Sequence, residues 1–148
     1  MNNLTVSQGA LARAERWYQS AERALDDKRW DDVIYSCQMA IEQVIKGILI
    51  LFGIEYPKKH DISEIYLSLK MEDVPKWFSD KMTYHAKILK ILIEKRSDAA
   101  YGYIEGKDIN DFRDDAGNFI KIAKEILDDC KKLILDFESE TKKSHTSQ

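Results

Sequence analysis

A chain of 148 residues is long enough for one domain with a substantial core, and its 23 basic and 26 acidic residues give a formal net charge of −3. This balance argues against a strongly basic nucleic-acid-binding protein, although a local basic groove remains possible. Only two prolines and six glycines accompany 44% hydrophobic and 33% charged residues, which indicates a mainly helical soluble protein.

The first residues carry no sign of a targeting segment. Met1 to Thr5 lack the charged start and the apolar core of a signal peptide. The longest apolar segment, 44–54, is interrupted by Lys46 and is shorter than the roughly 20 residues that span a bilayer. We therefore expect a cytoplasmic protein without a membrane partner. Cys37 and Cys130 are far apart on apolar helical faces, which is typical of reduced core thiols.

The first two predicted helices cover residues 7–27 and 30–52, where apolar residues recur every three or four positions. The second is the most hydrophobic segment of the chain. Within it, Glu42 and Lys46 lie one turn apart, a pair worth a few tenths of a kcal/mol if it is exposed. Gly47 costs about 1 kcal/mol inside a helix, and the close approach of another helix would explain its presence.

A break at Gly53 and Pro57 separates this helix from a short one predicted near 62–70, for which Asp61 is a suitable cap. His60 directly precedes this cap. We interpret it as a local hydrogen-bonding residue, with a role in a binding or catalytic site as the alternative.

Two more long helices are predicted, over residues 76–101 and 108–137. The first of them contains His85, which we interpret as a surface or packing histidine. The second begins at Asp108, a good capping residue, with Asp111 in the favourable first turn. The polar residues 139–148 are expected to form a frayed tail after a domain that covers residues 1–138.

Together these elements predict an all-α fold, an antiparallel up-and-down four-helix bundle with one additional short helix. Some apolar residues lie outside the main helical stripes and exceed what a small monomer easily covers. These residues are Phe78, Ile91, Ile104 and Ile122. They favour a two-fold symmetric homodimer, the commonest soluble assembly.

The segment from Arg96 to Tyr103 is the best candidate for a functional site. Arg96 lies four residues after Leu92, on or at the edge of the apolar stripe of its helix. An unpaired buried charge costs several kcal/mol, so this side chain either reaches a wet groove or is held there for use. Asp98, Tyr101 and Tyr103 follow and add a carboxylate and two hydroxyl groups.

Other chemistry is not supported by the sequence. It contains no glycine-rich phosphate or dinucleotide loop, and we expect no cofactor. The three histidines and two cysteines do not have the spacing of metal ligands, so we expect no metal. By elimination, Lys46 and His60 are the second candidates for ligand binding.

Short motifs follow one another in order over most of the chain, between residues 10 and 133. They are Ala14-x-x-Trp17, Ala21, Leu25, Trp30, Val33, Cys37-Gln38-x-Ala40-x-Glu42, Lys46-Gly47, Gly53, His60-x-Ile62-x-x-Ile65 and Arg96-x-x-Ala99-Ala100-Tyr101-Gly102. In order and spacing they resemble the HEPN (higher eukaryote and prokaryote nucleotide-binding) domain family.

The resemblance implies an up-and-down helical bundle that dimerises and places two copies of the arginine motif along one cleft. Many members are metal-independent RNases, often toxins, with a histidine four to six residues after the arginine. Others are noncatalytic partners of small nucleotidyltransferases. Here the position five residues after Arg96 is Tyr101, and a tyrosine hydroxyl is a poor base near neutral pH. In some toxins a tyrosine two residues after the histidine receives AMP from the partner, and Tyr103 has that spacing.

Our leading hypothesis is therefore a HEPN-type homodimeric module that binds a nucleotide or RNA and works with a small nucleotidyltransferase, in a toxin–antitoxin-like or related system. Arg96 would contact a phosphate, with Asp98 nearby, while Tyr101 and Tyr103 would donate hydrogen bonds or stack on a base. We expect this module not to be an enzyme.

Two alternatives remain. The first is a metal-independent endoribonuclease that uses Arg96 with Tyr101 in a degenerate Arg-x4-Tyr motif, or with His60 supplied from elsewhere in the fold. The second is a purely structural interaction module, in which Arg96 pairs with an acid such as Asp114 or Asp115.

Overall fold

The computed structural model describes the backbone of residues 2–146, and helices are the only regular secondary structure among these residues. The α-helices are α1 (Asn3–Asp26), α2 (Trp30–Leu51), α3 (Ser63–Ser68), α4 (Lys76–Tyr101) and α5 (Arg113–Thr146). Short 3₁₀-helices are η1 (Leu69–Met71), η2 (Gly102–Glu105) and η3 (Ile109–Phe112). The expected all-α class is confirmed.

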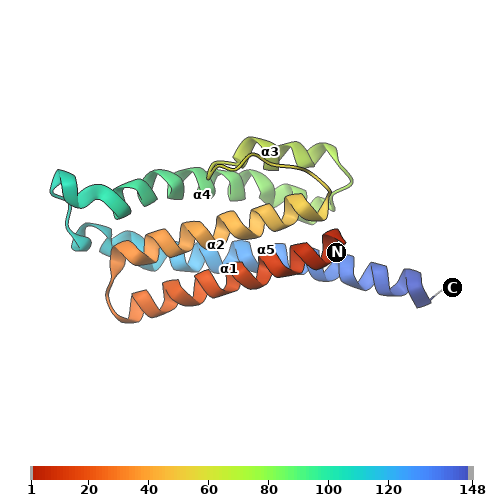
Figure 1. Ribbon diagram of the computed structural model, residues 1–148, viewed down its shortest axis with the longest axis horizontal. Helices are drawn as coiled ribbons and strands as arrows, with labels where there is room; N and C mark the ends of the chain where they lie inside the picture. Colours follow the sequence, from red (N-terminus) through yellow and green to blue (C-terminus); the bar gives the residue numbers. More distant parts are fainter. Residues whose placement is uncertain (1, 147–148) are drawn as a thin grey trace.

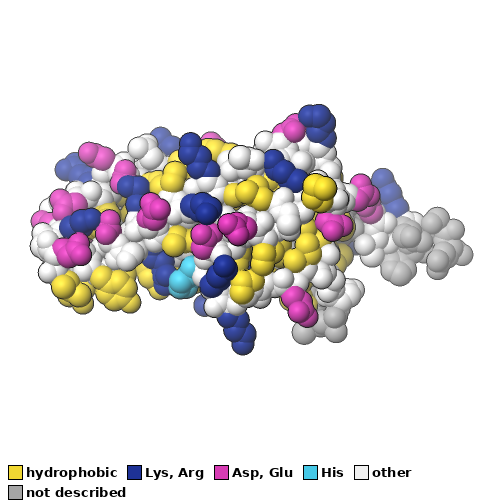
Figure 2. All heavy atoms as spheres, turned by 90° about the horizontal axis from the view of Figure 1, so that it is seen from above, with side chains coloured by type: hydrophobic (Ala, Val, Ile, Leu, Met, Phe, Trp, Pro, Cys, Tyr) yellow, Lys and Arg dark blue, Asp and Glu magenta, His cyan; other side chains and the backbone are white. Residues whose placement is uncertain are grey.

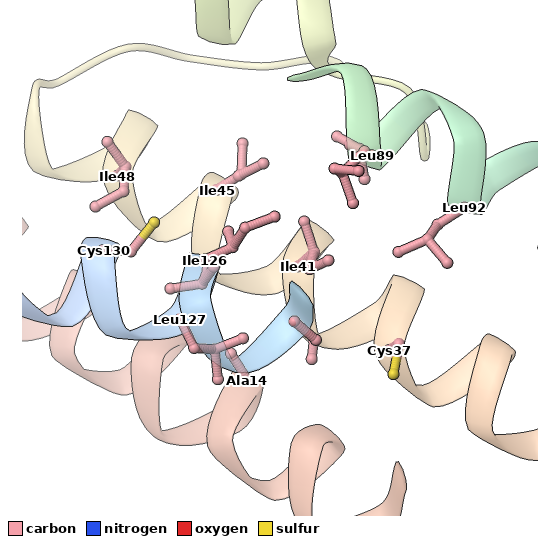
Figure 3. Packing of buried hydrophobic residues seen from close by; sticks show 14 of the residues in the cluster. Ala14, Cys37, Ile41, Ile45, Ile48, Leu89, Leu92, Ile126, Leu127 and Cys130 are labelled. Carbon is pink, nitrogen blue, oxygen red and sulfur yellow. The ribbon is translucent and has the colours of Figure 1, made fainter. Parts of the chain in front are cut away.

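Helix α2 is the centre of the fold, with α1, α4 and α5 packed against it (Figure 1). Figure 3 shows Ile41 and Ile45 of α2 between Leu89 of α4 and Ile126 of α5, and all four side chains are fully buried. Each such side chain contributes roughly 1.5–3 kcal/mol when it leaves water. Because α2 is covered on several sides, residues between its main apolar positions are buried as well.

The predicted helix boundaries are close to the observed ones, and the differences have local causes. Helix α1 begins at Asn3 rather than near residue 7, because the Asn2 side chain accepts a hydrogen bond from the Thr5 N–H at 2.8 Å. Helix α2 is followed by Gly53 with φ +73°, a left-handed conformation that favours glycine. Asp108 is a cap as predicted, but of the 3₁₀-helix η3, and α5 begins only at Arg113. The Asp111 carboxylate accepts the Asp108 N–H at 2.9 Å.

The close helix approach expected at Gly47 is present. A Cβ atom on Gly47 would lie 3.0 Å from the Cβ of Ala10 and 3.4 Å from the Ser7 carbonyl oxygen. Glycine at this position therefore lets α1 pack closely against α2.

The expectation of a frayed tail after residue 138 is wrong for the described residues, because α5 continues to Thr146. Phe137 packs edge-on against Phe52, with ring centres 5.3 Å apart. Beyond it, the Lys142 ammonium lies 3.1 Å from the Glu138 carboxylate one turn earlier, a pair that supports a polar helix. Residues 147 and 148 lie outside the described part of the chain.

Helix α2 is also long and apolar enough to cross a membrane by length and composition, unlike the shorter segment 44–54 considered above. Most of it is buried inside the fold, and the core helix of a globular domain passes the same test. Its length is therefore weak evidence for a membrane segment.

Three of the four apolar residues invoked for a homodimer are covered within one chain. Phe78 is fully buried against Tyr66, because α3 lies over α4, and Ile91 and Ile122 are partly buried against the core. Only Ile104, which is 71% exposed, is left uncovered as expected. The expectation for Phe78 was wrong because a helical wheel of α4 alone does not include α3.

Both cysteines have the predicted character. Cys37 and Cys130 are free and fully buried, and Figure 3 shows them in the hydrophobic core. Burial raises the pKa of Cys37 to about 12 and also raises that of Cys130. Both side chains therefore remain thiols at neutral pH and act as core residues.

Candidate functional site

Arg96 lies near the C-terminal end of α4 and reaches across to α2. Its Nη2 donates a hydrogen bond to the Tyr35 hydroxyl at 3.0 Å, and its Cζ lies 4.6 Å from the centre of the Tyr35 ring. Its Nε is buried without a hydrogen-bond partner among the described residues. A guanidinium over an aromatic ring gains about 0.5–2 kcal/mol, so Tyr35 holds Arg96 in a defined position.

Arg96 differs from the other arginines in its surroundings. The five others are exposed, whereas Arg96 is half-buried. No carboxylate in the described part of the chain forms an ion pair with it, and Asp115 instead binds Lys95 at 2.9 Å. The pairing with Asp114 or Asp115, considered for a purely structural arginine, is not formed.

The remaining residues of the predicted Arg96 site lie at the end of α4 and in η2. Tyr101 and Tyr103 are 63% and 71% exposed. Because five helical residues turn through about 140°, Tyr101 does not project from α4 beside Arg96. The Asp98 carboxylate lies 2.8 Å from the Lys107 ammonium, and this hydrogen bond raises the pKa of Lys107. The ion pair between Asp98 and Lys107 therefore stabilises the turn between α4 and α5.

Hydrophobic side chains gather at this end of the molecule (Figure 2). The exposed apolar and aromatic residues here are Tyr101, Tyr103, Ile104 and Ile109. In a single chain these side chains are exposed to solvent.

Lys46 and His60, the second predicted site residues, are brought together by Glu42 of α2, whose exposure the sequence left open. Glu42 is only 2% exposed. One carboxylate oxygen accepts a hydrogen bond from Gln38 at 2.8 Å and lies 2.8 Å from His60 Nδ1, and the other accepts one from Lys46 at 3.1 Å. The small energy of an exposed pair therefore does not apply to Glu42 and Lys46, because packing around α2 covers the carboxylate.

Lys46 and His60 also line an open cavity of about 1030 Å³. The cavity lies between the C-terminal half of α2, the loop that leads to α3 and the start of α1, and its lining includes Tyr56, Lys58 and Lys59. We call it the α2–α3 pocket. The Lys46 ammonium lies 5.5 Å from the centre of the Tyr56 ring, so an aromatic wall flanks the basic groups.

The Arg96 contact and the α2–α3 pocket are separate sites in one chain. Tyr35 and Lys46 are eleven residues apart on α2, which corresponds to about 16 Å along the helix axis. His60 binds Glu42 in the second half of α2 and is not brought to Arg96. The structure thus joins Lys46 with His60 but does not join either of them with Arg96.

His85 belongs to a third polar cluster, which is enclosed between α3, α4 and α5. His85 is fully buried, with Nδ1 2.8 Å from the Tyr66 hydroxyl and Nε2 2.9 Å from the Asp129 carboxylate. Burial lowers the pKa of His85, and the hydrogen bond to Asp129 partly opposes this effect. This geometry supports the packing role expected for His85.

Two residues that matter at these sites, Tyr35 and Glu42, were not among the candidate site residues predicted from the sequence. Tyr35 follows the buried residue Ile34 on α2, and its contact with Arg96 spans 61 positions, so helical periodicity gives no sign of it. For Glu42 a signal existed, since a carboxylate inside the most hydrophobic helix needs a partner when it is buried. Among the described residues, no group of His, Cys, Asp and Glu side chains could hold a metal ion.

Comparison with known protein families gives one match. A family model described as the HEPN domain matches residues 7–133, from the first turns of α1 into the second half of α5. The matched segment includes Arg96, Glu42, Lys46 and His60. No curated protein matches the chain. No solved structure matches it either.

Proposed function

Because this chain belongs to the HEPN domain family, which is generally nucleotide- or RNA-related, we propose that it is a noncatalytic module that binds a nucleotide or RNA through Arg96. The observation that carries this proposal is the half-buried Arg96 guanidinium without a carboxylate partner in the described chain. A structural arginine at this depth normally has an acidic partner, because an uncompensated buried charge costs several kcal/mol.

The contact with Tyr35 leaves Arg96 suited to an anion. A guanidinium has five N–H donors, and one of them binds the Tyr35 hydroxyl at 3.0 Å. The aromatic ring fixes the guanidinium plane without neutralising its charge. A phosphate group can then accept two parallel hydrogen bonds from the remaining donors, the geometry in which arginine binds phosphate most strongly.

A second copy of the chain completes the site in this proposal. The four long helices form an antiparallel up-and-down bundle with α3 as the additional short helix, and two bundles pair to place both copies of Arg96 along one cleft. The exposed Ile104 in η2, just after the end of α4, supports this arrangement, since a second chain would cover it while Tyr101 and Tyr103 face the cleft. Tyr101 and Tyr103 are then available to stack on a base.

The cellular setting is proposed from the family resemblance. The module acts in the cytoplasm, without a membrane partner, beside a small nucleotidyltransferase in a toxin–antitoxin-like or related system. Coexpression with a nucleotidyltransferase encoded by a neighbouring gene, followed by mass spectrometry of Tyr103, tests this part. A stable complex supports the partnership, and AMP attached to Tyr103 identifies that residue as its substrate.

The endoribonuclease alternative requires a proton acceptor beside Arg96. In the chain as described, the Tyr35 hydroxyl is the polar group bonded to Arg96, while His60 binds Glu42. Tyr101 lies on another side of α4. No observation therefore favours the nuclease over the binding module.

Binding of a fluorescently labelled single-stranded RNA, followed by anisotropy, tests the proposal. We expect Arg96→Gln to weaken binding at least tenfold, because a charge-assisted hydrogen bond contributes about 1.5–3 kcal/mol. Arg113→Gln removes the same charge from an exposed position and serves as the control. Equal affinities for the two variants would refute the role of Arg96, and metal-free cleavage of the RNA by the unmodified protein would favour the nuclease.

A further inference from the structure

We propose that the α2–α3 pocket is a second ligand site, which binds a free mononucleotide with its phosphate against Lys46, His60, Lys58 and Lys59. The inference shares with the proposed function only the chemical class of the ligand. It concerns another part of the chain, about 16 Å along α2 from the Arg96 contact.

The size of the pocket suits a nucleotide better than a bare anion. Its volume of about 1030 Å³ is at the upper end of the range for small-molecule sites. Inorganic phosphate would occupy a small part of it. Ile50, Ile54 and Tyr56 supply an apolar and aromatic wall on which a base can stack.

The charge of the lining selects an anion. Lys46, Lys58, Lys59 and His60 face the pocket, with Glu55 as the acidic residue in the lining. Because Glu42 beneath the pocket pairs with Lys46, the excess positive charge comes from Lys58 and Lys59. The chain as a whole has a formal net charge of −3, so the basic lining is a local feature and not a consequence of overall composition. A concave basic surface concentrates anions near it.

Glu42 gives the pocket a fixed geometry. This buried carboxylate lies under the pocket and binds Lys46 at 3.1 Å and His60 at 2.8 Å. The Lys46 side chain is 17% exposed and that of His60 is 49% exposed, so both reach the pocket while Glu42 holds them from behind. Lys46 uses one of its three N–H donors for Glu42 and retains two for a ligand.

Calorimetric titration of the full chain with AMP, adenosine and inorganic phosphate tests the inference. We expect AMP to bind more tightly than adenosine or phosphate alone, because the site contacts both ends of the nucleotide. The double variant Lys58→Gln/Lys59→Gln should weaken AMP binding at least tenfold, and it alters only exposed loop side chains. Lys46→Met should have a similar effect, with the melting temperature recorded to confirm that the variant is folded.

Two controls separate this site from the Arg96 contact. Lys87→Gln/Lys121→Gln removes the same charge from exposed positions outside the pocket and should leave AMP binding unchanged. The proposed function places a nucleotide or RNA at Arg96, so the AMP titrations are repeated in Arg96→Gln, where Lys58→Gln/Lys59→Gln should still weaken AMP binding at least tenfold.

The inference is overturned if AMP does not bind, if phosphate binds as tightly as AMP, or if Arg96→Gln abolishes AMP binding while the Lys58/Lys59 variant does not. In the last case the proposed function survives. If Arg96→Gln leaves RNA binding unchanged while Lys58→Gln/Lys59→Gln weakens AMP binding, the inference about the pocket is supported and the proposed function is refuted.

Discussion

Substitution of Glu42 by Gln gives the sharpest test of how α2 is built. The variant keeps the shape of the side chain and one acceptor oxygen, but it removes the charge that faces Lys46 and His60. Hydrogen bonds to charged groups contribute about 1.5–3 kcal/mol each. Lys46 is 17% exposed and can turn toward water, which offsets part of the loss. We therefore expect the free energy of unfolding to fall by about 2–3 kcal/mol.

Urea denaturation measures this change, and a chain of this size should also lose about 4–12 °C in melting temperature. A matched control is Asp128→Asn, because Asp128 pairs with Lys124 one turn away at 2.7 Å while both side chains are more than half exposed. Surface pairs contribute about 0–1 kcal/mol, so this variant should change stability by less than 0.5 kcal/mol. Similar small effects for both variants would refute the argument that Glu42 is a buried, multiply bonded carboxylate.

A double-mutant cycle separates the pair from its surroundings. If Glu42 and Lys46 interact directly, Glu42→Gln/Lys46→Met should cost at least 1 kcal/mol less than the sum of the two single variants. Additive costs would mean that Gln38 and His60 provide most of the stabilisation of the carboxylate.

Three further predictions concern other parts of the chain. Burial lowers the pKa of His85, so below about pH 6.5 the unfolded chain binds a proton that the folded chain does not, and the free energy of unfolding should decrease as the pH decreases. Urea denaturation at pH 7 and pH 5.5 should show a smaller decrease for His85→Gln than for the unmodified protein. Equal decreases would contradict this prediction. Gly47→Ala should destabilise the protein by about 1 kcal/mol in calorimetry, since the new Cβ would lie 3.0 Å from that of Ala10. Gly117→Ala, with open space around it, should stabilise the protein by about 0.5–1 kcal/mol. If both variants were more stable, α1 would have to move away from α2 at little cost. Ile104→Glu should reduce self-association in sedimentation without lowering the melting temperature, because Ile104 is 71% exposed in one chain, and an unchanged assembly would exclude this end of α4 from the interface.

Local sequence signals predicted the helices and most of their ends. Gly53 and Asp108 mark helix ends through their own backbone and capping preferences, which do not depend on the rest of the fold. The segment after Phe137 was mispredicted because its polar composition outweighed the support from Glu138 and Lys142 one turn apart. Composition is a weaker guide to a helix end than charge spacing in this segment.

The candidate sites were predictable only in part, because burial depends on several helices at once. Periodicity placed Arg96 at the edge of an apolar stripe, and the structure has it half-buried. Periodicity could not identify Tyr35 as the partner of Arg96, because their contact joins α4 to α2. The same limit applies to Glu42, since a wheel of α2 alone does not include the neighbours that cover its carboxylate.

The position of α2 explains how one chain could hold the two proposed binding sites separately. Tyr35 near its start positions Arg96, and Glu42, about two turns later, positions Lys46 and His60. Both sites therefore depend on the same buried helix for their geometry, but they share no side chain. A substitution that disturbs the packing of α2 should affect both sites together, whereas a substitution at either ligand-facing residue should affect one. Separate losses of RNA and AMP binding in otherwise stable variants would thus be the result expected from two sites on one rigid helix.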